Sequence, residues 1–329
     1  MNKKSFLLCV LASVCMLAAM SVSCEREGVY SPQRKISKIY VDDGAGRRLA
    51  QSWTWKGNRL ESITYTDQAI VDFRYHKNNQ LDSILLRPWC TTINDDYTAI
   101  YDYSPDYRGY YVVSYDKGGK HIMTIDLYWG SQLMERYEFD YNSDNLVTGY
   151  KKTVNFYQKG VTDGCVTDEL LCVLFPEFQK KMSVSQNAKR NVSKGSILLY
   201  TDTYITSFAY EGGNIVHSDI SSPQYGNYSY DYTYTQYQNP FFRMFQKGSP
   251  SSVSIYNQNL VKTSCYVNSL DGVIEKELCS WEYEMEKNCP VKATCNSKFF
   301  YENVDFLGEY TSLLDTAYYT ETYYYEYVR

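Results

Sequence analysis

Residues 137–146 read Tyr-Glu-Phe-Asp-Tyr-Asn-Ser-Asp-Asn-Leu, and this stretch contains the two patterns that decide the fold. Aromatic side chains at Tyr137, Phe139 and Tyr141 alternate with acidic ones. A period of two is typical of a strand with one packed face and one face in water. The polar run 142–145 consists of residues suited to a tight reversal, because Asn and Asp accept a positive φ. The two patterns together predict a strand of a β-hairpin and its turn.

The same order of an aromatic strand end, a short polar turn and an apolar residue recurs along the chain. Copies occupy residues 55–60, 75–81, 115–122, 141–146 and 210–215, with a shorter relative at 256–260. The repeat predicts an all-β protein, an antiparallel meander of consecutive hairpins that forms a barrel or a strongly curved sheet. Leu60 and Ile63 lie three apart rather than two, so we expect a bulge there or a leucine beneath its turn.

The composition favours sheet and argues against one class of partner. Of the 329 residues, 36 are tyrosine, which suits half-buried pleated surfaces. The net charge of -5 and the mean hydropathy of -0.47 describe a mildly acidic, polar chain. The 33 lysines and arginines are scattered and form no basic stripe, so nucleic acid is not expected as a partner.

The first residues have the pattern of an export signal. Lys3 and Lys4 precede an apolar run at 6–20 that is too short for a spanning helix. Ser-Val-Ser-Cys at 21–24 resembles a bacterial lipobox, which implies that Cys24 is lipidated; an ordinary secretory signal is the alternative. We therefore expect a lipid-anchored protein of a Gram-negative cell envelope, held at the outer membrane and either periplasmic or surface-exposed.

The pattern divides the chain into three parts. Residues 1–23 are the expected signal peptide, 24–35 a lipidated tether, and 36–329 a single β-hairpin-repeat domain. An insertion at about 152–200 lacks the repeat, and any helix of the protein is expected within 165–182.

Two cysteines flank a predicted turn. A three-residue loop near Gly272 would set Cys265 and Cys279 opposite each other, which makes them a candidate disulfide. A two-residue loop on Asp271 and Gly272 would instead set Cys265 opposite Leu278 and place the two cysteines on different faces.

The tandem hairpins resemble two known groups of proteins. One is the tyrosine-aspartate repeats of large secreted bacterial shell proteins, whose consensus is stricter. The closer likeness is to a family of bacterial lipoproteins of unknown function with a porin-like fold. Its members also show a tyrosine strand running into Asn-Pro-aromatic, here residues 230–241, and a strand before a Pro-containing turn, here 281–292. The chain departs from this pattern at its insertion and at Cys289.

The resemblance implies a barrel or a curved sheet and supplies no catalytic residues. Transmembrane strands carry an aliphatic band that faces lipid. Here the richer face of the strands is tyrosine and the other face is polar, so we expect a soluble, tethered domain.

No enzyme motif such as GxSxG, a P-loop, HExxH or GxGxxG occurs, so we expect no catalytic residue, metal or cofactor. The leading hypothesis is a non-enzymatic binding module with a glycan or a protein as ligand. The alternatives are a structural envelope scaffold and, less favoured, a glycan hydrolase.

The candidate binding residues are Trp89, Tyr107, Tyr110 and Trp129, because residues 87–111 combine a proline-fixed tryptophan with tyrosines in an irregular connection. The competing interpretation is that these side chains fill the packed face of the sheet.

Overall fold

The computed structural model describes residues 34–65, 70–87, 89–93, 99–102, 109–157, 198–223, 226–242, 257–270, 273–304 and 310–328. The predicted signal peptide, Cys24, Tyr107 and the expected helix at 165–182 lie outside these residues. All regular elements in the described part are strands, which confirms the all-β prediction. Among the described residues, no helix has the length and apolar character needed to cross a membrane.

The strands follow one another along the chain. Their bounds are β1 Ile36–Asp42, β2 Arg48–Lys56, β3 Arg59–Tyr65, β4 Ile70–Tyr75, β5 Leu81–Arg87, β6 Trp89–Ile93, β7 Ala99–Asp102, β8 Gly109–Tyr115, β9 Ile122–Trp129, β10 Gln132–Tyr141, β11 Val147–Tyr157, β12 Leu198–Glu211, β13 Asn214–Ser222, β14 Gly226–Gln238, β15 Asn259–Leu270, β16 Val273–Glu286, β17 Cys289–Val304 and β18 Tyr310–Tyr327.

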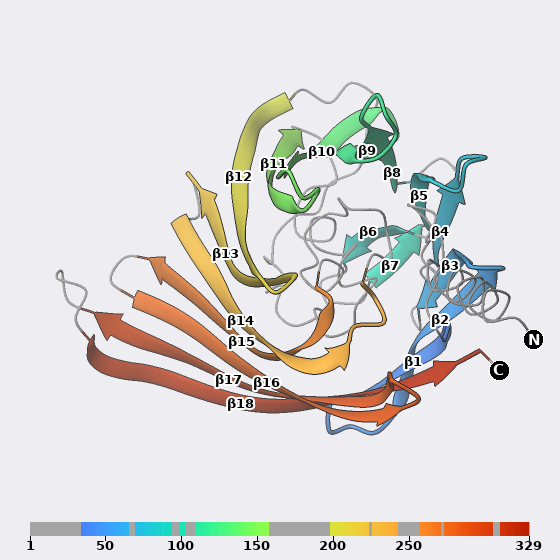
Figure 1. The fold of residues 1–329 in the computed structure, drawn as a ribbon. Helices are drawn as coiled ribbons and strands as arrows, with labels where there is room; N and C mark the ends of the chain where they lie inside the picture. Colours follow the sequence, from blue (N-terminus) through green and yellow to red (C-terminus); the bar gives the residue numbers. More distant parts are fainter. Residues whose placement is uncertain are drawn as a thin grey trace, which may run out of the picture.

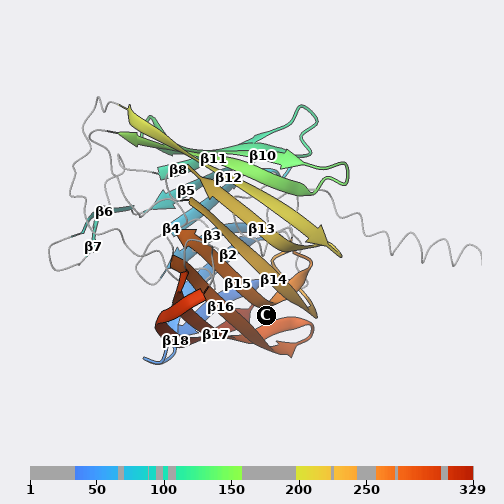
Figure 2. The same cartoon turned by 90° about the vertical axis from the view of Figure 1, so that its left-hand side faces the viewer.

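These strands form a closed antiparallel barrel by pairing with their neighbours in the chain. The meander is interrupted once, where β5 pairs with β8 and the hairpin β6–β7 forms a separate two-stranded sheet. Pairing of β1 with β18 closes the barrel through partners such as Ile39 and Tyr325. Except for β13, the strands from β12 onward are long and extend beyond the shorter strands of the other half (Figures 1 and 2).

The predicted turns reverse the chain between paired strands. The repeats at 55–60, 75–81, 115–122, 141–146 and 210–215 each contain the connection of a hairpin or of adjacent barrel strands. Gly212 and Gly213 form a two-residue turn with φ values of 56° and 80°, as a type I′ reversal requires. In the longer turns Asn79 and Asn145 take the left-handed conformation, with φ values of 71° and 59°.

The irregular spacing of Leu60 and Ile63 is explained by a bulge. The register of β2 and β3 shifts between Thr54 and Trp55, just before the turn. The next hairpin has the same shift between Arg74 and Tyr75. An extra residue in one strand restores the inward direction of the apolar side chains after each turn.

The structure differs from two predictions about the connections between strands. The stretch 256–260 was predicted as a shorter hairpin turn, but residues 239–258 connect β14 to β15, and Asn259 already pairs with Gln238. Strands also occupy both ends of the expected insertion at 152–200, because β11 ends at Tyr157 and β12 begins at Leu198. The rest of that insertion lies outside the described residues.

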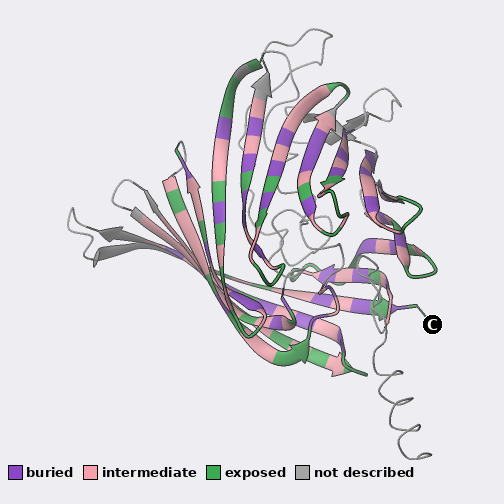
Figure 3. Cartoon of the chain, turned by 45° about the horizontal axis from the view of Figure 1, so that its top comes forward, coloured by how far each residue is buried: buried purple, intermediate pink, exposed green. Residues whose placement is uncertain are grey.

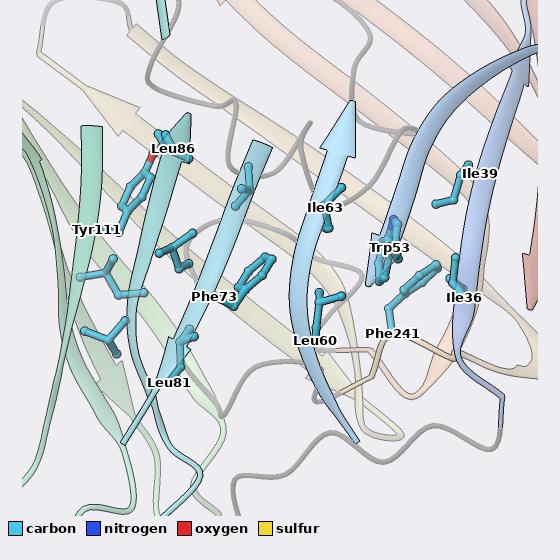
Figure 4. Close-up of a cluster of buried hydrophobic side chains, with 14 of the residues drawn as sticks. Ile36, Ile39, Trp53, Leu60, Ile63, Phe73, Leu81, Leu86, Tyr111 and Phe241 are labelled. Carbon is cyan, nitrogen blue, oxygen red and sulfur yellow. The ribbon is translucent and has the colours of Figure 1, made fainter. Parts of the chain in front are cut away.

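The apolar core lies inside the barrel. Buried positions alternate with more exposed ones along the strands (Figure 3). The core cluster includes side chains from β1 to β5 and β8, together with Phe241 from the β14–β15 connection (Figure 4). Phe241 is 2% exposed, and its ring centroid lies 6.4 Å from those of Trp53 and Tyr325. This connection therefore helps to fill the barrel near the ends of β2 and β18.

A set of aromatic hydrogen bonds explains why the sequence repeat exists. Near the end of one strand, a tyrosine hydroxyl or tryptophan N–H donates to a backbone carbonyl near the start of the adjacent strand. Eight such bonds are present among the described residues: Trp55 to Ile36, Tyr75 to Leu60, Tyr115 to Leu81, Tyr141 to Ile122, Tyr210 to Val147, Tyr234 to Ile215, Tyr283 to Val261 and Tyr327 to Pro290.

Each strand of the barrel takes part in one of these eight bonds, either as donor or as acceptor. We call these eight hydrogen bonds the strand-linking bonds. Burial raises the pKa of Tyr75, Tyr115, Tyr141 and Tyr210 above the ordinary value, so these hydroxyls keep their protons and remain donors. The repeat therefore specifies a hydrogen bond between adjacent strands as well as a turn.

Tyr141→Phe is expected to lower the free energy of unfolding by about 1 kcal/mol, because the carbonyl of Ile122 loses its hydroxyl donor at 2.7 Å. The control is Tyr318→Phe on the outer face, where the side chain is 72% exposed and a change within about 0.5 kcal/mol is expected. Urea unfolding measures both variants. Equal stability of the two variants would show that the strand-linking bonds contribute nothing to the free energy of unfolding.

Candidate functional site

The structure places three of the four predicted binding residues, each on a different strand, and Tyr107 lies outside the described residues. Trp89 begins β6 in the separate hairpin, and Trp129 ends β9, where its backbone pairs with Gly109. Tyr110 follows Gly109 on β8, and its ring stacks on Tyr128 at 5.3 Å and 15°. Because Tyr111 is the buried neighbour, Tyr110 and Tyr128 lie on the outer face. Side chains at Trp89 and Trp129 are outside the described part, so binding there stays a prediction.

The predicted disulfide between Cys265 and Cys279 is wrong. Leu270 pairs with Val273 across a two-residue loop, which sets Cys265 opposite Leu278 and Cys279 opposite Ser264. The two cysteines therefore point to opposite faces of the sheet, and both thiols are free. The shorter of the two loops considered from the sequence is the one that forms.

A surface that the sequence analysis did not nominate lies on the inner face of β14–β17. Two rows of half-buried side chains run across these strands. One row is Tyr228, Asn268, Glu275 and Tyr301, and the other is Tyr230, Tyr266, Glu277 and Phe299. We call these eight residues the tyrosine wall. Its inward direction follows from Tyr230, which packs against the apolar core.

The aromatic rings of the tyrosine wall contact one another. Tyr266 lies 5.1 Å from Tyr230 and 6.0 Å from Tyr228, measured between ring centroids. On the other side of the two glutamates, Phe299 and Tyr301 form an edge-to-face pair at 4.9 Å. Such contacts hold the rings in defined orientations, while their partial exposure leaves ring surface open for a ligand.

Two carboxylates lie between these aromatic groups. Tyr319, from β18, donates its hydroxyl to Glu277, and the Asn268 amide lies 3.5 Å from Glu275 Oε2. Burial raises the pKa of Tyr266 and Tyr319, and for Tyr319 the bond to Glu277 adds to the shift. The tyrosines are therefore neutral donors beside carboxylate acceptors, an arrangement suited to binding hydroxyl groups.

The inner face of β10–β12 continues the polar lining. Lys152 Nζ lies 3.6 Å from Glu135 Oε2, and both side chains are buried. Nearby on β12, Asp202 and Thr206 are 5% and 4% exposed. Asp202 Oδ2 and Thr206 Oγ1 have no hydrogen-bond partner. Among the described residues, no three His, Cys, Asp or Glu side chains are placed to hold a metal ion.

One signal in the sequence could have indicated the tyrosine wall. Glu275, Glu277, Cys279, Trp281 and Tyr283 share one face of β16 by the period of two, so this face mixes acids with aromatics. Buried faces are normally apolar, and acids on such a face point to a functional surface. What the sequence could not show is which tyrosines lie opposite these acids.

No known protein family and no curated protein matches this sequence. Among solved structures, a porin-like protein from Bacteroides vulgatus is similar over 90% of this chain and 99% of its own, with 9% identity and a TM-score of 0.42. A porin-like protein from Bacteroides uniformis is similar over 92% and 100%, with 10% identity and a TM-score of 0.31.

A third similar structure is a TcdB2-TccC3-Cdc42 complex, in which the match covers 85% of this chain and 16% of the other. The identity is 11% and the TM-score 0.28. Because these sequence identities and TM-scores are low, the function has to be argued from the residues of this chain.

Proposed function

We propose that this protein is a lipid-anchored binding protein of the cell envelope whose barrel interior binds a glycan without transforming it. The observation that carries the proposal is the tyrosine wall, in which partly exposed aromatic rings flank Glu275 and Glu277 on one inner face.

The wall has the two kinds of group that a sugar requires. Tyrosine rings stack on the apolar face of a pyranose, and carboxylates and amides accept hydrogen bonds from its hydroxyls. Ligand sites commonly combine aromatic surface with a few fixed polar groups. The unpaired buried oxygens of Asp202 and Thr206 also favour a ligand that is rich in hydroxyl donors.

The outer face of the barrel supports a location in water. Ion pairs cross neighbouring strands there, including Lys151 with Glu138 and Lys292 with Glu284, at 3.6 and 2.7 Å. Charged groups on a lipid-facing surface are strongly destabilising. In our proposal Cys24 carries the lipid that holds the domain at the membrane, and the barrel itself does not span it.

The proposal is tested by titrating the purified protein with a panel of neutral oligosaccharides in a calorimeter. Tyr266→Ala is expected to raise the Kd of the best ligand about tenfold, through the loss of one stacking ring. Glu277→Gln, which keeps the side-chain shape, is expected to weaken binding several-fold without changing the melting temperature. Tyr318→Ala on the outer face should bind as the wild type does. If no oligosaccharide binds, or if Tyr266→Ala and Tyr318→Ala bind equally, the proposal is wrong.

The same titration discriminates the remaining hypotheses. A protein that only scaffolds the envelope would bind none of the panel. Loss of binding in Trp89→Ala with an unchanged melting temperature would place the site at residues 87–111. A hydrolase is the second candidate, because Glu275 and Glu277 lie two residues apart on one face, roughly 6–7 Å along the strand. Release of reducing ends that is abolished by Glu277→Gln would support the hydrolase over the binding protein.

A further inference from the structure

Two thiols and one hydroxyl meet on the inner face of β16 and β17. Cys279 Sγ lies 3.1 Å from Ser297 Oγ, and Cys295 Sγ lies 3.6 Å from the same oxygen. The register sets Cys279 directly opposite Ser297 and Cys295 directly opposite Trp281. Cys279 and Cys295 are therefore diagonal neighbours on one face of paired strands, with side chains that converge on Ser297.

The diagonal geometry is close to that of a disulfide. Diagonal neighbours in an antiparallel pair have Cα atoms about 7–8 Å apart, with shorter Cβ distances. Disulfides span Cα separations up to about 6.8 Å. A decrease of roughly 1 Å in the Cα separation of Cys279 and Cys295 would thus bring them into bonding range, and the two sulfurs already lie near the same oxygen.

The environments of the cysteines also differ. A hydrogen bond from the Cys295 thiol, helped by Ser297, holds the pKa of Cys279 below its ordinary value although the side chain is largely buried. Burial raises the pKa of Cys265 on the outer face, and it raises the pKa of Cys289 as well. Attack on a disulfide requires a thiolate, so Cys279 is favoured as the nucleophile over Cys265 and Cys289.

We propose that Cys279 and Cys295 form a redox site that oxidises to a disulfide joining β16 to β17. The oxidant belongs to the disulfide class, such as oxidised glutathione or a thiol–disulfide oxidase. The Cys279 thiolate attacks one oxidant sulfur, which forms a mixed disulfide and releases one thiolate. Cys295 then gives up its proton and attacks the Cys279 sulfur, which releases the second thiolate. Two electrons pass to the oxidant, and the protein loses two hydrogens.

This site adjoins the tyrosine wall but does not depend on its ligand. Ser297, which both thiols contact, pairs with Tyr319, the residue that donates to Glu277. Formation of the disulfide would shift these two paired strands relative to each other next to that hydrogen bond. Oxidation of Cys279 and Cys295 would therefore alter one end of the tyrosine wall.

Trypsin makes the proposal directly measurable, because each cysteine concerned falls on its own peptide. Cys279 is expected on 277–287, Cys289 on 288–292 and Cys295 on 293–298. The full-length protein is treated with oxidised glutathione, its remaining thiols are alkylated, and the digest is analysed by mass spectrometry without reduction. The expected product is the 277–287 peptide joined to 293–298.

The controls separate a site built by the fold from random oxidation. Cys279→Ser and Cys295→Ser should each abolish the joined peptide, whereas Cys265→Ser should leave it unchanged. The bond should form at least about tenfold faster in the native protein than in urea, where the two strands are apart. Oxidation should also raise the melting temperature by several degrees, because the bond closes a short loop. The proposal is overturned if Cys279 and Cys295 stay fully alkylated in the oxidised native protein. It is also overturned if either residue joins another cysteine instead, or if the joined peptide forms equally fast in urea.

Discussion

Lys152→Met is expected to lower the free energy of unfolding by about 3–5 kcal/mol, because it removes the cation that lies beside the buried carboxylate of Glu135. The two groups lie 3.6 Å apart inside the barrel, with side chains that are 11% and 1% exposed. Tyr137 donates its hydroxyl to the same carboxylate oxygen at 2.9 Å. That bond does not supply the lost charge, so a large loss of stability is expected.

The preceding residue on β11 offers a matched control. Lys151 lies 3.6 Å from Glu138, the same separation, but this pair is on the outer face with side chains 52% and 48% exposed. Lys151→Met should cost less than about 1 kcal/mol, because water screens and solvates the remaining charge. The double variant Glu135→Gln with Lys152→Met should recover much of the loss. Urea midpoints measure all three, and similar losses for Lys151→Met and Lys152→Met would contradict the argument.

Phe241→Ala is expected to destabilise the barrel by about 3–5 kcal/mol, the usual cost of removing a fully buried aromatic ring. Phe241 is 2% exposed and packs against Trp53 and Tyr325, which belong to the strands on either side of β1. Its backbone N–H is fixed by Asn239 Oδ1 at 2.9 Å. The connection therefore stabilises the part of the barrel where the first and last strands meet.

The control for this prediction is Phe241→Leu, which keeps most of the buried volume and should cost no more than about 1.5 kcal/mol. Equilibrium unfolding in urea measures both variants, together with the slope that reports exposed surface. If Phe241→Ala unfolds at the same urea concentration as Phe241→Leu, the connection does not contribute to the core as argued. A changed slope would show instead that the two-state description fails for the variant.

Much of the architecture could be predicted because its signals are local. The turns at 75–81 and 141–146 depend on residues that accept a positive φ, and Asn79 and Asn145 adopt it. The inward direction of Tyr228, Tyr230 and Tyr232 follows from the period of two in a pleated strand. The bulge between Leu60 and Ile63 is one of two explanations that the spacing of the apolar residues allows, and the register confirms it.

The candidate site and the cysteine chemistry could not be predicted in the same way. A difference of one residue in the loop at Asp271 and Gly272 decides whether Cys265 faces Cys279 or Leu278, and the sequence suited either loop. The tyrosine wall requires that β14 lie beside β15, although residues 239–258 separate them in the chain. The acceptors of the strand-linking bonds are backbone carbonyls, which carry no sequence signal of their own.

The sequence by itself determined that this chain forms hairpins with one aromatic face, because turn conformation and strand alternation depend on neighbouring residues. Only the tertiary structure decided that the hairpins close into a barrel through pairing of Ile36 with Tyr327, at opposite ends of the domain. It also decided which side chains share the interior, as Lys152 and Glu135 do. Closure and partner choice depend on contacts between strands far apart in the chain, whose free energy is set by register and burial and not by local preference.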